Sequence, residues 1–283
     1  MLTNLRPLLG IYLLTGEKTR TEVNQKNMMT WRLLNLEVND AFTNMAIDEA
    51  IVQAQIKGLV SNTLRFYQWK PSAVSIGRFQ DVSNEVQIDN CRRLGIDIVR
   101  RISGGGTVYH DVEGEITYSI IAQEEIFGTK DVVQAYNAIC KGLIEAAKIL
   151  GVNADFNPGD PKNCPNIAIN GKKISGSSQF HQGGVMLQHG TFLLDTDLDR
   201  MFTLLRVPRK RLTSIKQEIG KTVPTEEAYQ ALIKGFEKAF QKKLREGELT
   251  TYEQKLAQEL RRDKFSTDEW NLRGKYILKP KPL

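Results

Sequence analysis

The chain has 283 residues, of which 41% are hydrophobic and 25% charged, as in a soluble globular protein without a membrane-spanning run. Three scattered cysteines exclude a disulfide framework and favour a reducing, cytoplasmic location, and three histidines without metal-ligand spacing argue against a metal site held by the protein. The net charge of +6 and the pI near 9.1 favour anionic ligands or an acidic partner over nucleic acid, because the basic residues are dispersed.

Hydrophobic spacing and capping residues predict the first elements. Residues 1–29 are expected to form an N-terminal extension, either a disordered arm or the product of a misassigned start codon. A strand is predicted over residues 30–36. An amphipathic helix should follow from Asp40 to Gly58, with Asp40 as a suitable cap and Glu49 on its solvated face.

Further elements lead to a run of glycines in the middle of the chain. Aromatic and β-branched residues predict strands at Thr63–Trp69 and Ala73–Ile76. Asn84–Leu94 has the character of a helix. Asp97–Arg101 is a predicted strand that leads directly into the glycines.

The glycine run, Gly104 to Gly106, comes just after Arg100 and Arg101. Glycines can adopt positive φ and let a ligand approach their N–H groups, which then form an anion-binding concavity. Arg101 adds a planar set of donors suited to phosphate or carboxylate. The loop does not match a dinucleotide fingerprint or a P-loop, because it is not succeeded by a helix or by a Gly-Lys-Ser/Thr ending.

The segment after the glycines is predicted to be a hairpin. Its strands would be Gly106–Tyr109 and Glu115–Ala122, with a turn over residues 111–114. A plain glycine-rich turn is the alternative interpretation of this segment, and the paired arginines make it the less favoured one.

The second half of the chain contains a clear helix at Asp131–Leu150, ended by Gly151 in the usual C′ place. Cys140 lies on its apolar face and is expected to be a buried core residue. Two further helices are predicted over residues 225–242 and 252–262.

A hairpin is predicted around Asn170-Gly171, a dipeptide that favours a type I′ turn between strands at Ile167–Ile169 and Lys173–Ser178. Val185–Leu187 and Thr191–Leu194 should continue the sheet. This order of strands and helices predicts an α+β fold with a mixed, largely antiparallel sheet and flanking helices.

Three motifs point to one family: Arg-Arg-x-Ser-Gly-Gly-Gly-Thr-Val-Tyr-His-Asp at 100–111, Gly-Lys-Lys-Ile-Ser-Gly-Ser at 171–177 and Leu-Gln-His-Gly-Thr at 187–191. Together they resemble the lipoate–protein ligase and octanoyltransferase family, which shares its catalytic domain with biotin–protein ligases. The resemblance runs from about Trp31 to Asn271. It implies a catalytic domain over residues 30–272 and a C-terminal tail over residues 273–283.

The resemblance also implies distinct roles for residues of the site. Lys173 matches the family's lysine and would place a positive charge between the reacting carboxylate and the α-phosphate of ATP, whereas Lys172 should be solvated. Apolar residues such as Val108, Tyr109 and Ile120 would line a tunnel for an eight-carbon chain, since burying each methylene is worth about 0.8 kcal/mol.

The predicted ATP- and acyl-binding residues are Arg78, Arg101, Ser103, Gly104, Gly105, Gly106, Thr107, Val108, Tyr109, His110, Lys173, Ser175, Gly176 and His189. His189 is either catalytic or a structural hydrogen-bonding residue, and both interpretations stay open. His110 is expected to position other groups from the tip of the hairpin, and His181 to lie on the surface. Asn44 and Asp48 could support the site from the first helix.

Cys164 is the residue that separates the branches of the family. In one branch of octanoyltransferases, a cysteine upstream of the lysine motif forms a thioester, and the lysine helps to form the thiolate. Here nine residues take the chain from Cys164 to Lys173, fewer than in that branch, and Asn166-Ile167 resembles a ligase segment. Cys164 is therefore a candidate nucleophile only if the chain is a transferase, and an ordinary loop cysteine otherwise.

From the sequence we favour an ATP-dependent lipoate–protein ligase that uses Mg²⁺, forms an acyl-adenylate from lipoate or octanoate, and acylates a lysine of a lipoyl domain. The alternative is an octanoyl-carrier-protein:protein octanoyltransferase. A biotin–protein ligase or a non-catalytic acyl or lipoyl-domain binder is less favoured. Expected acceptors are lipoyl domains of 2-oxoacid dehydrogenases or the glycine cleavage H protein, with a separate small subunit as a further candidate partner; no nucleic acid or membrane is expected.

Overall fold

The computed structural model describes residues 30–275 except 129–130, 161–163 and 207–210. The extension predicted over residues 1–29 and most of the tail predicted from residue 273 lie outside the described residues, so the predicted division into domains stays a prediction. No helix within the described ranges is both long enough and apolar enough to cross a membrane.

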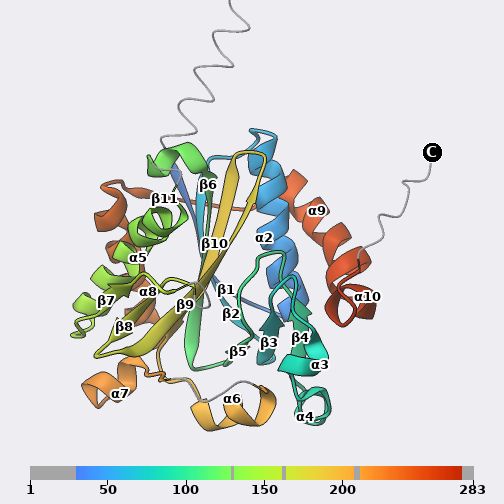
Figure 1. The fold of residues 1–283 in the computed structure, drawn as a ribbon. Helices are drawn as coiled ribbons and strands as arrows, with labels where there is room; N and C mark the ends of the chain where they lie inside the picture. Colours follow the sequence, from blue (N-terminus) through green and yellow to red (C-terminus); the bar gives the residue numbers. More distant parts are fainter. Residues whose placement is uncertain (1–29, 129–130, 161–163, 207–210, 276–283) are drawn as a thin grey trace, which may run out of the picture.

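The centre of the molecule is an eight-stranded mixed sheet in the order β11-β1-β2-β6-β10-β9-β8-β7 (Figure 1). Its strands are β1 (Trp31–Asn39), β2 (Asn62–Trp69), β6 (Glu115–Gln123), β7 (Asp155–Asn157), β8 (Asn166–Ile169), β9 (Lys172–Gln182), β10 (Val185–Leu193) and β11 (Leu244–Gly247). Strand β1 is parallel to β2 and β11, and the other neighbours are antiparallel. The predicted α+β class with a mixed, largely antiparallel sheet is confirmed.

Strand β10 was predicted as two segments and is one strand. Its middle residues pair with β6 on one side and with β9 on the other, so the polar motif Gln188-His189-Gly190 stays within the ladder. The hairpin between β8 and β9 is confirmed: Asn170 and Gly171 both have positive φ, 49° and 74°, as a type I′ turn requires.

A smaller sheet contains β4 (Asp97–Arg100), β3 (Ala73–Ile76) and β5 (Val108–His110), in that order. The hairpin predicted over residues 106–122 is wrong, because β5 pairs with β3 while β6 belongs to the large sheet. The connecting turn is held by distant partners: the Val112 N–H donates to Ser72 Oγ, and the Asp197 N–H donates to Asp111 Oδ2.

Two pairs of helices cover the large sheet (Figure 1). On one face, α5 (Val132–Ile149) packs against α8 (Thr225–Phe240), and buried Cys140 lies in their core as predicted. On the other face, α2 (Ala41–Ile56) packs against α9 (Thr251–Leu260). Asp40 caps α2 by accepting from the Thr43 N–H.

Glu49 on α2 is not solvated as predicted. The chain continues from α9 into a π-helical turn, η2 (Arg261–Phe265), which packs on α2. Lys264 of this turn forms an ion pair with Glu49 at 2.6 Å, and both side chains are largely buried. The prediction failed because the partner comes from the far end of the sequence.

Short helices complete the fold. The single helix predicted at residues 84–94 is two helices, α3 (Val82–Glu85) and α4 (Ile88–Arg93). The break arises because Val86 forms a β-bridge with Leu205, and the Gln87 N–H donates to the Leu204 carbonyl. The other short helices are η1 (Glu124–Phe127), α6 (Leu198–Leu204), α7 (Ile215–Ile219) and α10 (Asp268–Asn271).

Candidate active site

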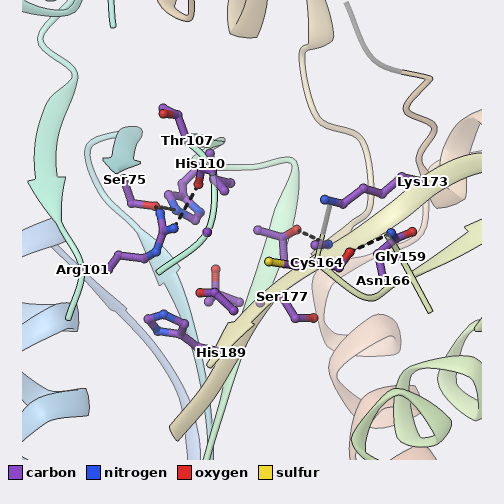
Figure 2. Close-up of a pocket in the computed structure, with 18 of the residues that line it drawn as sticks. Ser75, Arg101, Thr107, His110, Gly159, Cys164, Asn166, Lys173, Ser177 and His189 are labelled. Atoms are coloured by element: carbon purple, nitrogen blue, oxygen red, sulfur yellow. Dashed lines mark hydrogen bonds between the residues drawn. The ribbon is translucent and has the colours of Figure 1, made fainter. Parts of the chain in front are cut away.

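A cavity of about 440 Å³ lies between the two sheets (Figure 2). Its inner end is lined by buried Met45, Tyr67 and Trp69, and its mouth by exposed residues such as Asp160 and Arg211. The inner end therefore offers buried apolar and aromatic surface beside buried polar side chains such as His110 and Thr117, and the mouth is polar and exposed. Such a cavity suits a ligand with a long apolar part and a polar reactive end.

The glycine loop after β4 forms one wall of the cavity. Gly105 has φ +84°, and a Cβ at Gly77 would lie 2.1 Å from the Gly105 carbonyl oxygen, so both positions require glycine. Within the described part of the chain, the N–H groups of Gly104, Gly105 and Gly106 have no hydrogen-bond acceptor. These amides are free to receive an anionic or carbonyl oxygen, and the predicted binding of an anion by the loop stays a prediction.

Arg101 holds this loop in shape from within. Its guanidinium donates to the carbonyls of Gly104 and Gly106 at 2.9 and 3.0 Å, and to Ser75 Oγ at 2.8 Å. The side chain lines the cavity and is almost fully buried. The structure thus gives Arg101 a role in supporting the loop, and its predicted contact with phosphate or carboxylate stays a prediction.

His110 supports Arg101 in turn. Its Nε2 lies 2.7 Å from Ser75 Oγ, its Nδ1 lies 2.7 Å from Glu115 Oε1, and its ring stacks on Trp69. With a carboxylate at Nδ1, the imidazole keeps its proton there, so Ser75 donates to Nε2 and accepts from Arg101. His110 does position other groups, but from a buried strand and not from a hairpin tip.

Arg100 points the other way. Its guanidinium donates to the carbonyls of Gly77, Gln80 and Trp270, and the Trp270 indole N–H donates back to the Arg100 carbonyl at 2.8 Å. Arg78 packs over the Trp270 ring and donates to the Gly274 carbonyl, and it does not line the cavity. These two arginines fasten the C-terminal segment to the back of the glycine loop.

His189 on β10 lies between an acid and a serine. Its Nδ1 is 3.1 Å from Asp48 Oδ2, and its Nε2 is 2.6 Å from Ser103 Oγ, which is itself 2.9 Å from Ser178 Oγ. Burial lowers the pKa of His189 despite the opposing effect of Asp48, so the imidazole is neutral at physiological pH.

Asp48 is a buried carboxylate with four partners. It accepts from Arg65, Tyr67, Ser119 and His189. Burial alone would raise its pKa, but the hydrogen bond from His189 and the charge of Arg65 outweigh burial and lower the pKa of Asp48. Asp48 contacts His189 of the cavity wall, and Asn44 Oδ1 accepts from the same Arg65, so the predicted support of the site by these two residues stays a prediction.

The opposite wall is the β8–β9 hairpin and the segment before it (Figure 2). Lys173 lines the cavity, and its backbone is fixed between the Arg211 carbonyl and the Thr213 N–H. Its side chain lies over Gly176, where a Cβ would be 2.6 Å from Nζ. Lys172 points outward and pairs with Glu218, half-exposed and not simply solvated.

Cys164 also lines this wall and is exposed. Its Sγ lies 3.9 Å from the position that a Cβ on Gly105 would occupy, so the thiol faces the glycine loop across the cavity. Asn166 donates to the Cys164 carbonyl, while the buried Asn166 Oδ1 has no partner among the described residues. The segment therefore presents a thiol, an ammonium and an unpaired amide oxygen to whatever occupies the cavity.

Most of the predicted binding residues do meet at this cavity. The lining residues predicted from the sequence are Arg101, Gly105, Gly106, Thr107, Val108, His110, Cys164, Lys173, Gly176 and His189. Ser103 and Gly104 belong to the loop behind this surface. The buried Ser175 hydroxyl has no hydrogen-bond partner among the described residues. Tyr109 and Ile120 belong to hydrophobic core clusters, so the proposed tunnel lining was wrong for these two.

Several lining residues were missed from the sequence: Met45, Tyr67, Trp69, Ser75, Asn166, Ser177 and Ser178. Ser177 and Ser178 stand at the end of the lysine motif, which was a usable signal. The aromatic residues were assigned only to a strand, because nothing local shows which face of β2 meets the cavity. The described residues contain no cluster of acidic, cysteine and histidine side chains able to hold a metal.

Comparison with known proteins confirms the resemblance seen in the motifs. Residues 40–237 match the family model described as the lipoyl protein ligase A/B catalytic domain. The chain is 37% identical to the octanoyltransferase LipM of Symbiobacterium thermophilum, over 86% of this chain and 98% of that protein. It is 35% identical to the octanoyltransferase LipM of Brevibacillus brevis, over 87% of this chain and all of that protein.

Solved structures with the same fold include lipoate-protein ligases. A lipoate-protein ligase A bound with ATP matches with a TM-score of 0.78 and 32% identity, over 86% of this chain and 98% of that one. A bipartite lipoate protein ligase from Thermoplasma acidophilum, described with its E2 lipoyl domain, matches with a TM-score of 0.75 and 30% identity, over 90% of this chain and all of that one.

Proposed function

The chain belongs to the lipoyl protein ligase A/B catalytic-domain family, and we propose that within it the protein is an octanoyltransferase that works through a thioester on Cys164. This reverses the preference drawn from the sequence, where the ATP-dependent ligase came first. Two findings favour the alternative: relatives over nearly their whole length are named octanoyltransferases, and Cys164 faces the glycine loop within the cavity.

The observation that carries the proposal is the position of the thiol. A loop cysteine without a chemical role has no need to face the free amides of the glycine loop, yet Cys164 Sγ does so from the opposite wall. In this position a thioester carbonyl on Cys164 could receive hydrogen bonds from the Gly105 or Gly106 N–H. Lys173, on the same wall, would supply positive charge beside the sulfur.

The buried inner end suits the acyl chain. Met45, Tyr67 and Trp69 line it, and burying each methylene of an octanoyl group there is worth about 0.8 kcal/mol. The polar mouth would receive the two protein substrates in turn. A carrier protein delivers the octanoyl thioester, and a lipoyl domain presents the acceptor lysine. The net charge of +6 favours binding of such partners where they are acidic.

The reaction has two steps in this proposal. The Cys164 thiolate attacks the octanoyl thioester carbonyl, the bond to the carrier's sulfur breaks, and that sulfur leaves as a thiolate that takes up a proton. The acceptor lysine amine then attacks the new thioester, a C–N bond forms, the C–S bond breaks, and the amide departs. No ATP is consumed in either step.

The ligase remains the second candidate, supported by the ATP-bound neighbour. The residues that would bind ATP in that case are the glycine loop amides and Lys173, with Asn166 and Arg211 near the mouth. ATP and its Mg²⁺ would supply the activation that a carrier thioester otherwise supplies. A cytoplasmic location and an accessory subunit stay predictions.

The test is donor preference with an apo lipoyl domain as acceptor. We expect the wild-type protein to octanoylate the acceptor lysine from octanoyl-carrier protein without ATP, measured by intact-protein mass spectrometry. Cys164→Ser should lose this activity, because a serine hydroxyl does not ionise as a thiol does, and Cys140→Ser is the matched control. Pyrophosphate release from ATP with free octanoate or lipoate, retained in Cys164→Ser, would instead establish the ligase.

A further inference from the structure

Four side chains form a continuous hydrogen-bonded line from the core to the cavity. Asp48 Oδ2 and His189 Nδ1 are 3.1 Å apart, His189 Nε2 and Ser103 Oγ 2.6 Å, and Ser103 Oγ and Ser178 Oγ 2.9 Å. All four residues are buried, and His189 and Ser178 also line the cavity. This line comes from α2, β10, the glycine loop and β9, and the reaction steps proposed above make no use of it.

Asp48, at the core end of this line, fixes the direction of each hydrogen bond. Asp48 is held as a carboxylate by Arg65, so His189 must carry its proton on Nδ1 and accept on Nε2. Ser103 therefore donates to His189 and accepts from Ser178. Ser178 is left with its oxygen lone pairs available to a donor in the cavity, so the line as a whole is ready to take up a proton from there.

The outer end of the line lies beside the thiol. Ser178 Cβ and Cys164 Sγ are 3.3 and 3.9 Å from the same point, the position of a Cβ on Gly105. A lysine amine that attacks a thioester on Cys164 must come close to this point. An amine arrives largely protonated at neutral pH and must lose a proton before it can attack.

Resting on the proposed function, we propose that Asp48, His189, Ser103 and Ser178 form a proton relay that deprotonates the acceptor lysine in the second step. Ser178 accepts the first proton of the lysine ammonium and passes its own to Ser103, and Ser103 passes its proton to His189 Nε2. The free amine forms the C–N bond. Its second proton goes to the departing Cys164 sulfur as the C–S bond breaks, and His189 later returns its proton to solvent through the cavity.

The surroundings of His189 suit a base that must return to neutrality after each turnover. Three charged or titratable groups act on it: Asp48 from α2, Arg101 from the start of the glycine loop, and His110 from β5. Arg65 and Tyr67 of β2 reach it through Asp48. Asp48 stabilises the imidazolium formed during transfer, whereas burial and the charge of Arg101 favour its release of the proton.

The experiment separates the two steps. Wild-type protein, Ser178→Ala and His189→Gln are first loaded with octanoyl-carrier protein, and adduct formation is followed by mass spectrometry. The loaded proteins are then mixed with apo lipoyl domain, and single-turnover transfer is measured from pH 6 to 9. Ser177→Ala is the matched control, because Ser177 lines the same wall but bonds to Tyr118.

We expect Ser178→Ala and His189→Gln to load normally and to transfer about 100-fold more slowly at neutral pH. Their transfer rate should increase with pH up to pH 9, because hydroxide replaces the missing base. Ser177→Ala should keep the wild-type pH dependence. Loading that is slowed as much as transfer, or a variant pH dependence equal to the wild-type one, would overturn the relay. Failure of the wild-type protein to load would reject the transferase itself and this role with it.

Discussion

The two walls of the cavity differ in how completely their polar groups are paired. On the inner wall, formed by the glycine loop with Ser75, His110 and His189, side chains from distant segments are buried and hydrogen-bonded to one another. On the outer wall, formed by residues 164–173, Cys164 is exposed and Asn166 Oδ1 has no partner within the described chain. The contrast indicates that one wall is a fixed support and the other presents the reacting groups.

This division has an energetic basis. A buried polar group left without a partner costs about 1–3 kcal/mol, so the paired side chains of the inner wall resist rearrangement when a ligand enters. On the outer wall the exposed Cys164 bears no such cost, whereas the buried Asn166 Oδ1 bears it until a ligand supplies a donor. Substitutions in the two walls should therefore have different effects. A substitution in the inner wall should lower stability, and one in the outer wall should lower activity at constant stability.

The largest effect on activity is expected from Lys173→Ala on the outer wall. Because its ammonium would stabilise negative charge in both steps, octanoyl transfer should fall by at least about 100-fold. The thermal unfolding midpoint should stay close to the wild-type value, since the side chain lies at the cavity surface. Lys172→Ala is the control and should transfer nearly normally. Near-wild-type transfer by Lys173→Ala would contradict the assignment of the outer wall.

The largest effect on stability is expected from Asp48→Asn on the inner wall. It leaves buried Arg65 without its ionic partner, which should lower the free energy of unfolding by about 3–5 kcal/mol. Asp89→Asn makes the same chemical change in an exposed pair 3.8 Å long and should change stability by less than about 1 kcal/mol. Urea denaturation measures both, and equal stability of the two variants would argue against a tightly paired inner wall.

The pH dependence of stability depends on the same buried carboxylate. The pKa of Asp48 is lowered in the fold, so its stabilisation is present above the usual carboxyl range near pH 4 and is lost as the pH falls through its folded value. The lowered pKa of His189 acts in the same direction, because the unfolded chain takes up its proton first, near pH 6.5. Acid should therefore destabilise the wild-type protein, and Asp48→Asn should show a smaller loss below pH 4.

A smaller loss is expected from Gly105→Ala in the glycine loop. At φ +84° an L side chain is strained, which should cost about 1–2 kcal/mol of stability. Gly104→Ala is the matched control, since a Cβ there meets no atom within 4 Å and its φ is not positive. Chemical denaturation of both variants tests the prediction. Equal stabilities would show that the loop adapts to a side chain.

The smallest change is a difference in thiol labelling. Burial raises the pKa of Cys91 to about 11 and that of Cys140 to about 12, so neither thiol should react with iodoacetamide at neutral pH. Cys164 is exposed and should be alkylated in the native protein. Peptide mapping after brief labelling would show this, and labelling of all three cysteines at similar rates would contradict the buried placement of the other two.

The features that depend on local patterns could be predicted from the sequence. The four long helices, the Asp40 cap and the Asn170-Gly171 turn are each encoded in neighbouring residues, and all were confirmed. The three motifs also located most of the cavity wall. Contacts between distant segments could not be predicted. His189 and Asp48 are 141 positions apart, and no local sequence pattern indicates that they are in contact.

Adjacent arginines show the same limit. Nothing in the sequence distinguishes the roles of Arg100 and Arg101. Arg100 bonds to Trp270 and Arg101 to the glycine loop, because neighbouring residues at a strand end point to opposite sides. Glu49 looked solvated because Lys264 comes from the other end of the chain. The hairpin at residues 106–122 failed because its turn bonds to Ser72 and Asp197.

The central claim, that Cys164 carries the acyl group, is tested most directly by trapping the intermediate. Wild-type protein would be mixed with octanoyl-carrier protein in the absence of ATP and acceptor, and its intact mass measured before and after hydroxylamine. We expect one octanoyl group per chain, removed by hydroxylamine and mapped to the peptide that contains Cys164. An unmodified protein that instead forms octanoyl-AMP from octanoate and ATP would contradict the claim.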